Sequence, residues 1–381
     1  MIYLDNGATS FPKPISVCNN VSRSLRNYSA NPGRSGHKLS LIAAKEIFEC
    51  RKSLKELFNV ESEEEVIFTQ NCTMALNTVI LGTLNPGDHV IISSVEHNSV
   101  TRPLEELKKK NISYSTFDYS ENADEIINNV RELIRPETKL VICTHASNVF
   151  GFRFPIERLC ALCHTYGILF CVDAAQSAGV FTIDMQKDEY DFVCIAGHKG
   201  LYGPMGTGVL LLGNHSLRPL LFGGTGTESL KKVQPDALPE KFESGTQNLN
   251  GIAGLRCGVD FVRNKGVENL YKKEYNLANY LYNSLKKIPN VKLYTKDFSF
   301  GKYAPVISFN IENMHSEEVV AILDKNGICA RGGLQCSPLA HNYMNTTETG
   351  TVRIVPGAFN TMNDINKLIF VIKTICMKQV K

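Results

Sequence analysis

The sequence predicts an α/β protein in which a mostly parallel β-sheet is covered by helices on both faces. Short apolar runs of strand length recur along the first half of the chain, and helical patterns lie between them. Strands that alternate with helices form parallel sheets with two covered faces. Seven runs have this character: 66–69, 90–93, 112–117, 140–144, 169–173, 192–196 and 208–212.

Other segments predict what precedes and follows this sheet. Residues 1–14 form an extended arm, because Pro12 and Pro14 are incompatible with a helix there. Apolar residues at helical spacing predict a helix over 39–58. The glycines and prolines of 223–245 predict an irregular loop or hairpin that covers the functional site.

A smaller α+β domain is expected after this loop. At 381 residues the chain is long enough for two domains. We predict a large domain over 15–253, and a small domain formed by 254–381 together with the arm 1–14. The expected elements are helices 252–264 and 268–287, strand 306–310 and a last helix 363–377.

The composition excludes several classes of partner and location. A net charge of +3 and the lack of basic runs interleaved with aromatics argue against nucleic acid as a partner. The N-terminus has no basic segment followed by an apolar one, and no later stretch is apolar for about 18 residues. We therefore expect neither a signal peptide nor a membrane span, and a cytoplasmic location.

The cysteines indicate a reducing compartment. The chain has 12, and some of them stand singly in apolar runs, as Cys143, Cys171 and Cys194 do. Cys160 and Cys163 have CxxC spacing, but no second pair stands at zinc-finger distance. We interpret that pair as helix packing and predict no metal site.

A lysine in an apolar setting indicates covalent chemistry. Lys199 lies between the strand-like run 192–196 and the glycine-rich segment 203–212, where it has little access to water. A desolvated lysine has a lowered pKa and forms a Schiff base with an aldehyde. Pyridoxal phosphate (PLP) supplies such an aldehyde, and Asp173, at the end of another strand, suits its pyridinium nitrogen. Alone, Asp173 could equally be a helix cap.

The motifs around these two residues resemble a known family. Residues 172–177 (VDAAQS) and 196–204 (AGHKGLYGP) are similar to class V aminotransferases, and best to the cysteine desulfurase and selenocysteine lyase branch, short-loop group. Matching motifs extend from residues 3–9 (YLDNGAT) to Arg353. The resemblance implies the fold type I of PLP-dependent transferases, with a seven-stranded sheet, and a homodimer.

The resemblance also implies how the cofactor is held. Gln176 resembles the residue that hydrogen-bonds the phenolic oxygen of PLP, and Thr73 and His198 the residues that contact its phosphate. Thr73 stands where a strand passes into a helix, a natural phosphate site, although plain N-capping is the alternative. Thr246 corresponds to a residue that reaches the phosphate of the neighbouring subunit.

Three further residues are candidates for the substrate side. His97 resembles the histidine stacked over the PLP ring, with proton transfer as a possible further role. Asn148 corresponds to a residue that contacts the substrate near the ring. Arg353 has the planar fork that suits an amino acid carboxylate, although a salt bridge within the small domain is the alternative.

Cys336 is the residue that distinguishes a desulfurase from PLP enzymes that need no thiol. It lies in a polar loop, 331–339, and resembles the cysteine that receives sulfur in the short-loop desulfurases. Many members read Arg-Ser-Gly-His-His-Cys there, whereas this chain has Gly332, Leu334 and Gln335 in place of the serine and the two histidines. That difference removes polar neighbours and leaves the activation of the thiol open, and an inert exposed thiol is the alternative.

The resemblance implies conversion of L-cysteine to L-alanine, with the sulfur left on Cys336 as a persulfide. A sulfur-acceptor protein, as in iron–sulfur cluster assembly, would then take the sulfur. Selenocysteine lyase, acting on L-selenocysteine, uses the same site and is the nearest alternative. An aminotransferase, another PLP lyase or a non-catalytic interaction protein remain further alternatives.

Overall fold

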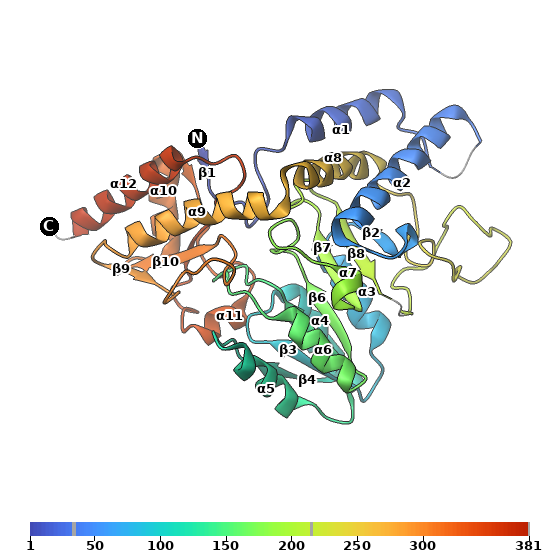
Figure 1. Ribbon diagram of the computed structural model, residues 1–381, viewed down its shortest axis with the longest axis horizontal. Helices are drawn as coiled ribbons and strands as arrows, with labels where there is room; N and C mark the ends of the chain where they lie inside the picture. Colours follow the sequence, from blue (N-terminus) through green and yellow to red (C-terminus); the bar gives the residue numbers. More distant parts are fainter. Residues whose placement is uncertain (33–35, 214–215, 380–381) are drawn as a thin grey trace.

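A computed structural model describes residues 1–32, 36–213 and 216–379. Figure 1 shows a large sheet with its helices in one part of the molecule, and a smaller part that contains the C-terminus. The N-terminal strand lies in that smaller part, beside the C-terminal segment. Within the described residues, no helix is both long and apolar enough to cross a membrane.

The large sheet has seven strands in the order β2-β8-β7-β6-β5-β3-β4. β8 runs antiparallel to β2 and β7, and the other neighbours are parallel. The predicted mostly parallel, seven-stranded sheet is confirmed, with each strand within two residues of its expected bounds. The strands are β2 (Val66–Thr69), β3 (His89–Ser93), β4 (Ser113–Phe117), β5 (Thr138–Thr144), β6 (Leu169–Asp173), β7 (Phe192–Ala196) and β8 (Gly208–Leu212).

Helices surround this sheet. The predicted helix 39–58 is α2, which is capped by His37, whose ring accepts the N–H of Ser40. The sequence analysis did not predict α1. The helices are α1 (Ile15–Asn27), α2 (Lys38–Phe58), α3 (Cys72–Thr83), α4 (Asn98–Leu107), α5 (Ala123–Leu133), α6 (Ile156–Thr165), α7 (Met185–Asp188), α8 (Leu249–Lys265) and α9 (Val267–Leu285).

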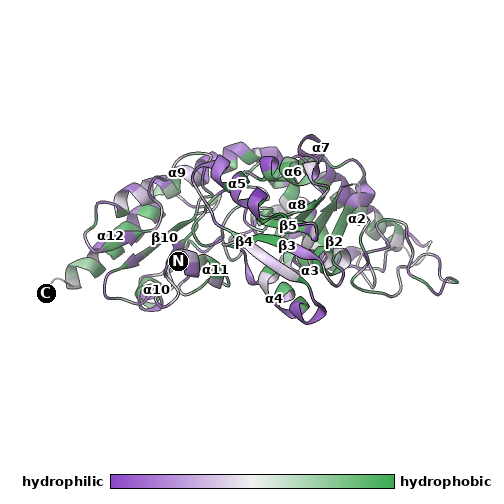
Figure 2. Cartoon of the chain, turned by 90° about the horizontal axis from the view of Figure 1, so that it is seen from below, coloured by the Kyte–Doolittle hydropathy of each residue, from purple (hydrophilic) through white to green (hydrophobic). Residues whose placement is uncertain are grey.

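Both faces of the sheet are buried, because successive side chains of a strand point to opposite faces. In β6, Phe170 and Val172 belong to one core with residues of α2, α5, α6 and α8, whereas Cys171 belongs to a second core with α3 and α4. Figure 2 shows α5, α6 and α8 on one side of the apolar strands, and α3 and α4 on the other. This double burial explains why the strands are apolar throughout.

The C-terminal part is built on a three-stranded antiparallel sheet, in the order β12-β10-β9. The arm joins it, because β1 pairs in parallel with β11 and Asp5 bridges to Val355. Its elements are β1 (Ile2–Tyr3), β9 (Val291–Leu293), β10 (Ile307–Ile311), α10 (Ser316–Lys325), β11 (Ile328–Cys329), α11 (Pro338–Tyr343), β12 (Val352–Ile354) and α12 (Met362–Gln379).

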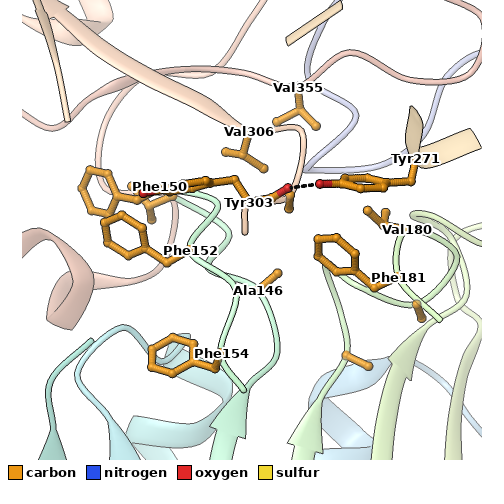
Figure 3. Close-up of a cluster of buried hydrophobic side chains, with 14 of the residues drawn as sticks. Ala146, Phe150, Phe152, Phe154, Val180, Phe181, Tyr271, Tyr303, Val306 and Val355 are labelled. Carbon is orange, nitrogen blue, oxygen red and sulfur yellow. Dashed lines mark hydrogen bonds between the residues drawn. The ribbon is translucent and has the colours of Figure 1, made fainter. Parts of the chain in front are cut away.

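An aromatic cluster joins the two parts (Figure 3). Phe150 and Phe152, from the loop after β5, stack with ring centroids 5.5 Å apart, and Phe152 lies 6.1 Å from Tyr303, which precedes β10. The hydroxyl of Tyr271 in α9 donates to the carbonyl of Tyr303 at 2.9 Å. These contacts hold the loop that carries Asn148 against the C-terminal part.

Two predictions concern the segments between the parts. Residues 223–245 contain neither helix nor strand, as expected, and Figure 1 shows this stretch extending away from the sheet. The predicted domain boundary, between 253 and 254, falls inside α8, which packs on α1 and α2. The division of the chain into domains stays a prediction.

Candidate active site

Four polar side chains follow parallel strands of the large sheet. His97 follows β3, Asn148 follows β5, Asp173 ends β6 and Lys199 follows β7. These strands are parallel, so their carboxyl ends meet at one edge, where ligands of open α/β sheets bind. The structure places all four at this edge, as the sequence predicts, and their roles remain predictions.

Lys199 is fixed by a tight turn. The N–H of Tyr202 donates to the Lys199 carbonyl at 2.8 Å. A side chain on Gly200 would bring its Cβ within 2.3 Å of the Ala178 carbonyl oxygen, so this backbone approach requires glycine. Lys199 keeps some exposed surface, more than the sequence suggests. Burial nevertheless lowers its pKa, against the opposing charge of Asp173. A lowered pKa favours the neutral, nucleophilic amine.

Asp173 is buried beside Lys199. Its Oδ1 accepts the N–H of Ala175 at 2.8 Å and lies 3.6 Å from the thiol of Cys72, at the start of α3. No helix directly follows Asp173 in the described part of the chain, so the helix cap considered as the alternative is absent, and the carboxylate instead accepts a hydrogen bond within a turn. Only Oδ1 makes these contacts, which leaves Oδ2 for another partner. Cys72 was not among the predicted site residues.

His97, Ser99 and Thr73 form a hydrogen-bonded chain at the starts of two helices. The Nδ1 atom of His97 accepts the N–H of Ser99 at 3.1 Å and lies 2.8 Å from its hydroxyl. The hydroxyls of Ser99 and Thr73 are 2.7 Å apart. Burial lowers the pKa of His97, so its neutral form is favoured. Since Nδ1 accepts, the ring proton belongs on Nε2. The sequence analysis missed Ser99, which links the two predicted residues.

The N-terminal arm contacts His198 and Gln176. The carbonyl of His198 accepts the N–H of Ser10 at 3.1 Å and the ammonium of Lys13 at 2.7 Å. Burial lowers the pKa of His198 to about 4. Its Nδ1 is buried and has no hydrogen-bond partner among the described residues. Gln176 donates through Nε2 to the carbonyl of Gly7 at 2.8 Å. Gln176 and the Lys199 turn are thereby joined to the arm.

Arg353 and Asn148 lie together at the junction with the C-terminal part. Arg353 is 1% exposed, and its Nη1 donates to the carbonyl of Asn148 at 2.9 Å. Its Nη2 pairs with Oδ1 of Asp5 at 2.7 Å, and its Nε has no partner among the described residues. The salt bridge considered as the alternative for Arg353 is thus present. It links strand β12 to the N-terminal arm.

Cys336 is exposed and has an arginine beside it. The Nη2 atom of Arg331 lies 3.6 Å from the sulfur of Cys336. The main-chain carbonyl of Cys336 accepts the N–H of Asn98 at 2.9 Å. The second contact ties the loop to the residue after His97. The sequence indicated that this thiol lost its polar neighbours. The serine and the two histidines are absent, but Arg331, which the motif retains, places a cation next to the sulfur.

Gln335, in contrast, is buried and turned away from solvent. Its amide donates to the carbonyl of Thr351 at 2.8 Å, and its side-chain oxygen lies 2.9 Å from Nε2 of His341. The main-chain oxygen of Gln335 accepts the amide of Asn148 at 2.8 Å. The residue before Cys336 therefore anchors the loop to the site instead of flanking the thiol.

Comparisons with known proteins identify the family. The model of the class V aminotransferases matches residues 2–368. The chain belongs to this family. Two curated relatives, both called probable cysteine desulfurases, are 32% identical to it. That of Halalkalibacterium halodurans aligns over 97% of this chain and 91% of its own length, and that of Methanothermobacter thermautotrophicus over 96% and 92%.

A solved structure agrees with this assignment. The apo cysteine desulfurase of Thermococcus onnurineus NA1 superposes with a TM-score of 0.91 at 29% identity, over 99% of this chain and 95% of that one. Both parts of the fold are therefore shared with a class V enzyme. The fold type I architecture predicted from the sequence is confirmed.

Class V aminotransferases are PLP-dependent enzymes, and the residues of this chain fit that cofactor. Lys199 offers an amine with a lowered pKa, and Asp173 a buried carboxylate with Oδ2 uncommitted. The orphaned, buried Nδ1 of His198 and the N-terminus of α3 at Thr73 provide donors for a phosphate. Thr246 is exposed and stands apart from these residues along the chain, so its predicted contact across a dimer stays a prediction.

Proposed function

We propose that this class V enzyme is a cysteine desulfurase, which converts L-cysteine to L-alanine and leaves the sulfur on Cys336 as a persulfide. One observation carries the proposal: an exposed thiol lies beside a guanidinium on a loop that is hydrogen-bonded to the site through Asn98 and Asn148. An aminotransferase needs no thiol at this place. The names of the relatives agree with this assignment.

The bound cofactor would be held by Lys199 at its aldehyde carbon, by Asp173 at the ring nitrogen, and by Thr73 and His198 at the phosphate. When bound, PLP supplies an electron sink for charge that develops at the substrate Cα. The Asp173 carboxylate would keep a proton on the ring nitrogen and so maintain this sink. Gln176 is proposed as the neighbour of the phenolic oxygen.

Lys199 and His97 are the candidates for proton movement. The Lys199 amine, with its lowered pKa, can take the Cα proton near neutral pH and return it. We place the neutral His97 ring over the cofactor, with its proton on Nε2 because Nδ1 accepts the N–H of Ser99. This tautomer can donate a hydrogen bond from Nε2 to a substrate atom. His97 thus serves both to stack and to donate.

Arg353 and Asn148 would bind the substrate carboxylate. Two of the guanidinium nitrogens already have partners, in Asp5 and the carbonyl of Asn148, and Nε remains. A substrate carboxylate either uses Nε or displaces Asp5 from Nη2. The substrate is then oriented with its sulfur toward the Cys336 loop.

Sulfur transfer is assigned to Cys336. Its thiolate attacks the sulfur of the substrate, so a sulfur–sulfur bond forms as the carbon–sulfur bond breaks. The electron pair of the broken bond stays with the substrate carbon, which takes up a proton, and alanine leaves. In total, cysteine and an enzyme thiol give alanine and a persulfide, and no external oxidant is needed. Arg331 stabilises negative charge on the sulfur.

We further propose a cytoplasmic homodimer that passes sulfur to an acceptor protein, as in iron–sulfur cluster assembly. All 12 cysteines are free, which suits a reducing compartment. Large apolar side chains are exposed on α1, on α2 and along residues 221–233, as expected of a surface covered by a second subunit. They are Leu25, Leu39, Leu41, Phe48, Leu221, Phe222, Leu230 and Val233.

The deciding experiment compares Cys336→Ala with wild type in alanine and sulfide release from L-cysteine, with a reductant and at equal PLP content. We expect the variant to lose at least roughly two orders of magnitude, because it lacks the nucleophile. Cys18→Ala is the matched control, since Cys18 is also an exposed thiol, in α1. It should turn over like wild type.

Other outcomes would point to the alternatives. If Cys336→Ala releases alanine as fast as wild type, Cys336 is a bystander and the desulfurase proposal is wrong. Turnover of L-selenocysteine alone, independent of Cys336, would identify a selenocysteine lyase. Consumption of a 2-oxo acid would identify an aminotransferase. Absence of the PLP–lysine absorbance band after reconstitution would indicate a non-catalytic protein.

A further inference from the structure

A second group of reactive side chains lies at the opposite edge of the large sheet. Cys160 and His164 are four residues apart on α6, so they share one face of the helix. Asp191 immediately precedes β7, and its carboxylate meets that face. The ligating atoms of all three lie within 4.8 Å of one another. None of these residues takes part in the proposed desulfurase chemistry.

The distances between these atoms are those of metal ligands. Nε2 of His164 is 3.2 Å from Oδ2 and 3.3 Å from Oδ1 of Asp191, and 3.7 Å from Sγ of Cys160. In a tetrahedral zinc site, with bonds of about 2.0 Å to nitrogen or oxygen and about 2.3 Å to sulfur, neighbouring ligands lie about 3.3 to 3.6 Å apart. The distances from His164 to the other two ligands are therefore close to those that a tetrahedral ion imposes, and Cys160 Sγ lies within 4.8 Å of the Asp191 carboxylate.

The group opens onto a cavity through which an ion can enter. This cavity has a volume of about 470 Å³, and its lining includes His164 and Asp191. Three carboxylates also line it, those of Glu61, Glu65 and Glu189. Negative charge around an entrance raises the local concentration of cations. Water in the cavity, or one of these carboxylates, can provide a fourth ligand.

We propose that Cys160, His164 and Asp191 form a binding site for a divalent transition metal, with Zn²⁺ as the ion that best suits the donors. Thiolate, imidazole and carboxylate together are typical zinc ligands, whereas Mg²⁺ and Ca²⁺ prefer oxygen alone. On binding, the Cys160 thiol loses its proton to solvent. The sequence analysis predicted no metal site, because it paired Cys160 with Cys163, whereas the ligand partners are His164 and the distant Asp191.

The site would link α6 to β7 far from the cofactor. Lys199 follows the carboxyl end of β7, and Asp191 precedes its amino end. The five residues of β7 separate these ends by roughly 15 Å at about 3.3 Å per residue. The metal is therefore structural, and the proposal is independent of the desulfurase reaction.

A simpler arrangement competes with this proposal. His164 lies in the last turn of α6, and a histidine there pairs with a carboxylate and with the helix dipole without any metal. That arrangement requires only His164 and Asp191. In that arrangement the thiol of Cys160 has no part in binding. It lies 3.6 Å from the carbonyl oxygen of Glu189. Participation of Cys160 in binding therefore distinguishes the metal site from the metal-free pair of His164 and Asp191.

The test uses chelator-treated, PLP-loaded protein titrated with Co²⁺, the spectroscopic substitute for Zn²⁺. We expect one ion per chain, with a thiolate-to-cobalt charge-transfer band and intense tetrahedral ligand-field bands, both lost when Zn²⁺ displaces the cobalt. Cys160→Ser should abolish the charge-transfer band. His164→Ala should weaken binding by roughly 100-fold. Zn²⁺ should raise the melting temperature of wild type, but not of these variants.

Cys163→Ser is the matched control, because Cys163 is buried in the same helix but is not among the ligands. It should bind cobalt as wild type does. His164 is partly exposed, so its variant serves if Cys160→Ser folds poorly, which the PLP absorbance would reveal. The proposal is overturned if wild type binds no stoichiometric cobalt, or if Cys160→Ser and His164→Ala retain the same bands.

Discussion

The charged residues at the two ends of strands β6 and β7 differ in how completely they are paired. At the carboxyl ends, the charges of Asp173 and Lys199 act on each other, yet no direct ion pair joins them among the described residues. At the amino end, the Asp191 carboxylate is hydrogen-bonded to the N–H of Phe170 at 2.6 Å and to His164. The hydrogen-bonded Asp191 and His164 join α6 to β7. Asp173 and Lys199 are incompletely paired and therefore remain available for chemistry.

In the comparison of the two strand ends, the largest effect is expected from removing charge at the carboxyl end. Asp173→Asn should lower alanine release by about 10- to 100-fold, because a charge-assisted hydrogen bond worth about 1.5 to 3 kcal/mol is lost. Steady-state kinetics at equal PLP content measure this effect. Asp188→Asn, at the end of α7 and four residues before β7, is the control and should leave turnover unchanged. Equal losses in both variants would contradict the contrast between the two ends.

Glu96 provides a second test of incomplete pairing, through pH. It is fully buried after β3, where Oε1 accepts from Ser93 and from the N–H of Thr144, while Oε2 has no partner among the described residues. Burial raises its pKa from 4.5 to about 8. The folded protein therefore holds a proton that the unfolded chain releases between these values, so this group destabilises the fold as pH rises toward 8.

Glu96→Gln should remove this pH-dependent loss of folding stability, because glutamine resembles the protonated form of glutamate. We expect the variant to be more stable than wild type by about 1 to 3 kcal/mol above pH 8, with a smaller gain near pH 5. Urea unfolding of the PLP-loaded proteins at several pH values measures the difference. A gain that does not depend on pH would mean that Glu96 is ionised throughout.

The smallest effect concerns the exposed thiol. Arg331→Gln should slow persulfide formation on Cys336 by about two- to fivefold, because an ion contact in solvent contributes only about 0.5 to 1 kcal/mol. Mass spectrometry of the persulfide after a single turnover measures the rate. Arg331→Lys should recover part of it, and high salt should weaken the wild-type advantage. A loss of PLP in the variant would instead indicate a structural role.

The sheet could be predicted from sequence because burial on both faces makes each strand apolar over its whole length. Lys199 and Asp173 were identifiable for a related reason, since a charged residue at or shortly after the end of a buried strand requires an explanation. The helix α1 was missed. It follows Pro14, and only three of its residues, Val17, Asn20 and Ser24, are buried, so its apolar signal is weak.

The contacts that distinguish this site were not predictable in the same way. Ser99, Cys72 and Arg331 have ordinary local sequences, and their importance comes from neighbours that the fold supplies. The same is true of Asp191, which lies 27 residues from His164 along the chain. Convergence of side chains from separate elements has no local signature, so sequence patterns located the strand ends but not these partners.

The pairing of Asp5 with Arg353 spans 348 positions of the chain. Its neighbours also join the two extremes, because Ile2 and Tyr3 lie in register with Ile328 and Cys329. During synthesis the large sheet can form early, but the arm has no partner until the last segments leave the ribosome. The end of the site that we propose to bind the substrate carboxylate is therefore the last to assemble, and a chain that stops short of β11 would leave the arm unpaired and the enzyme inactive.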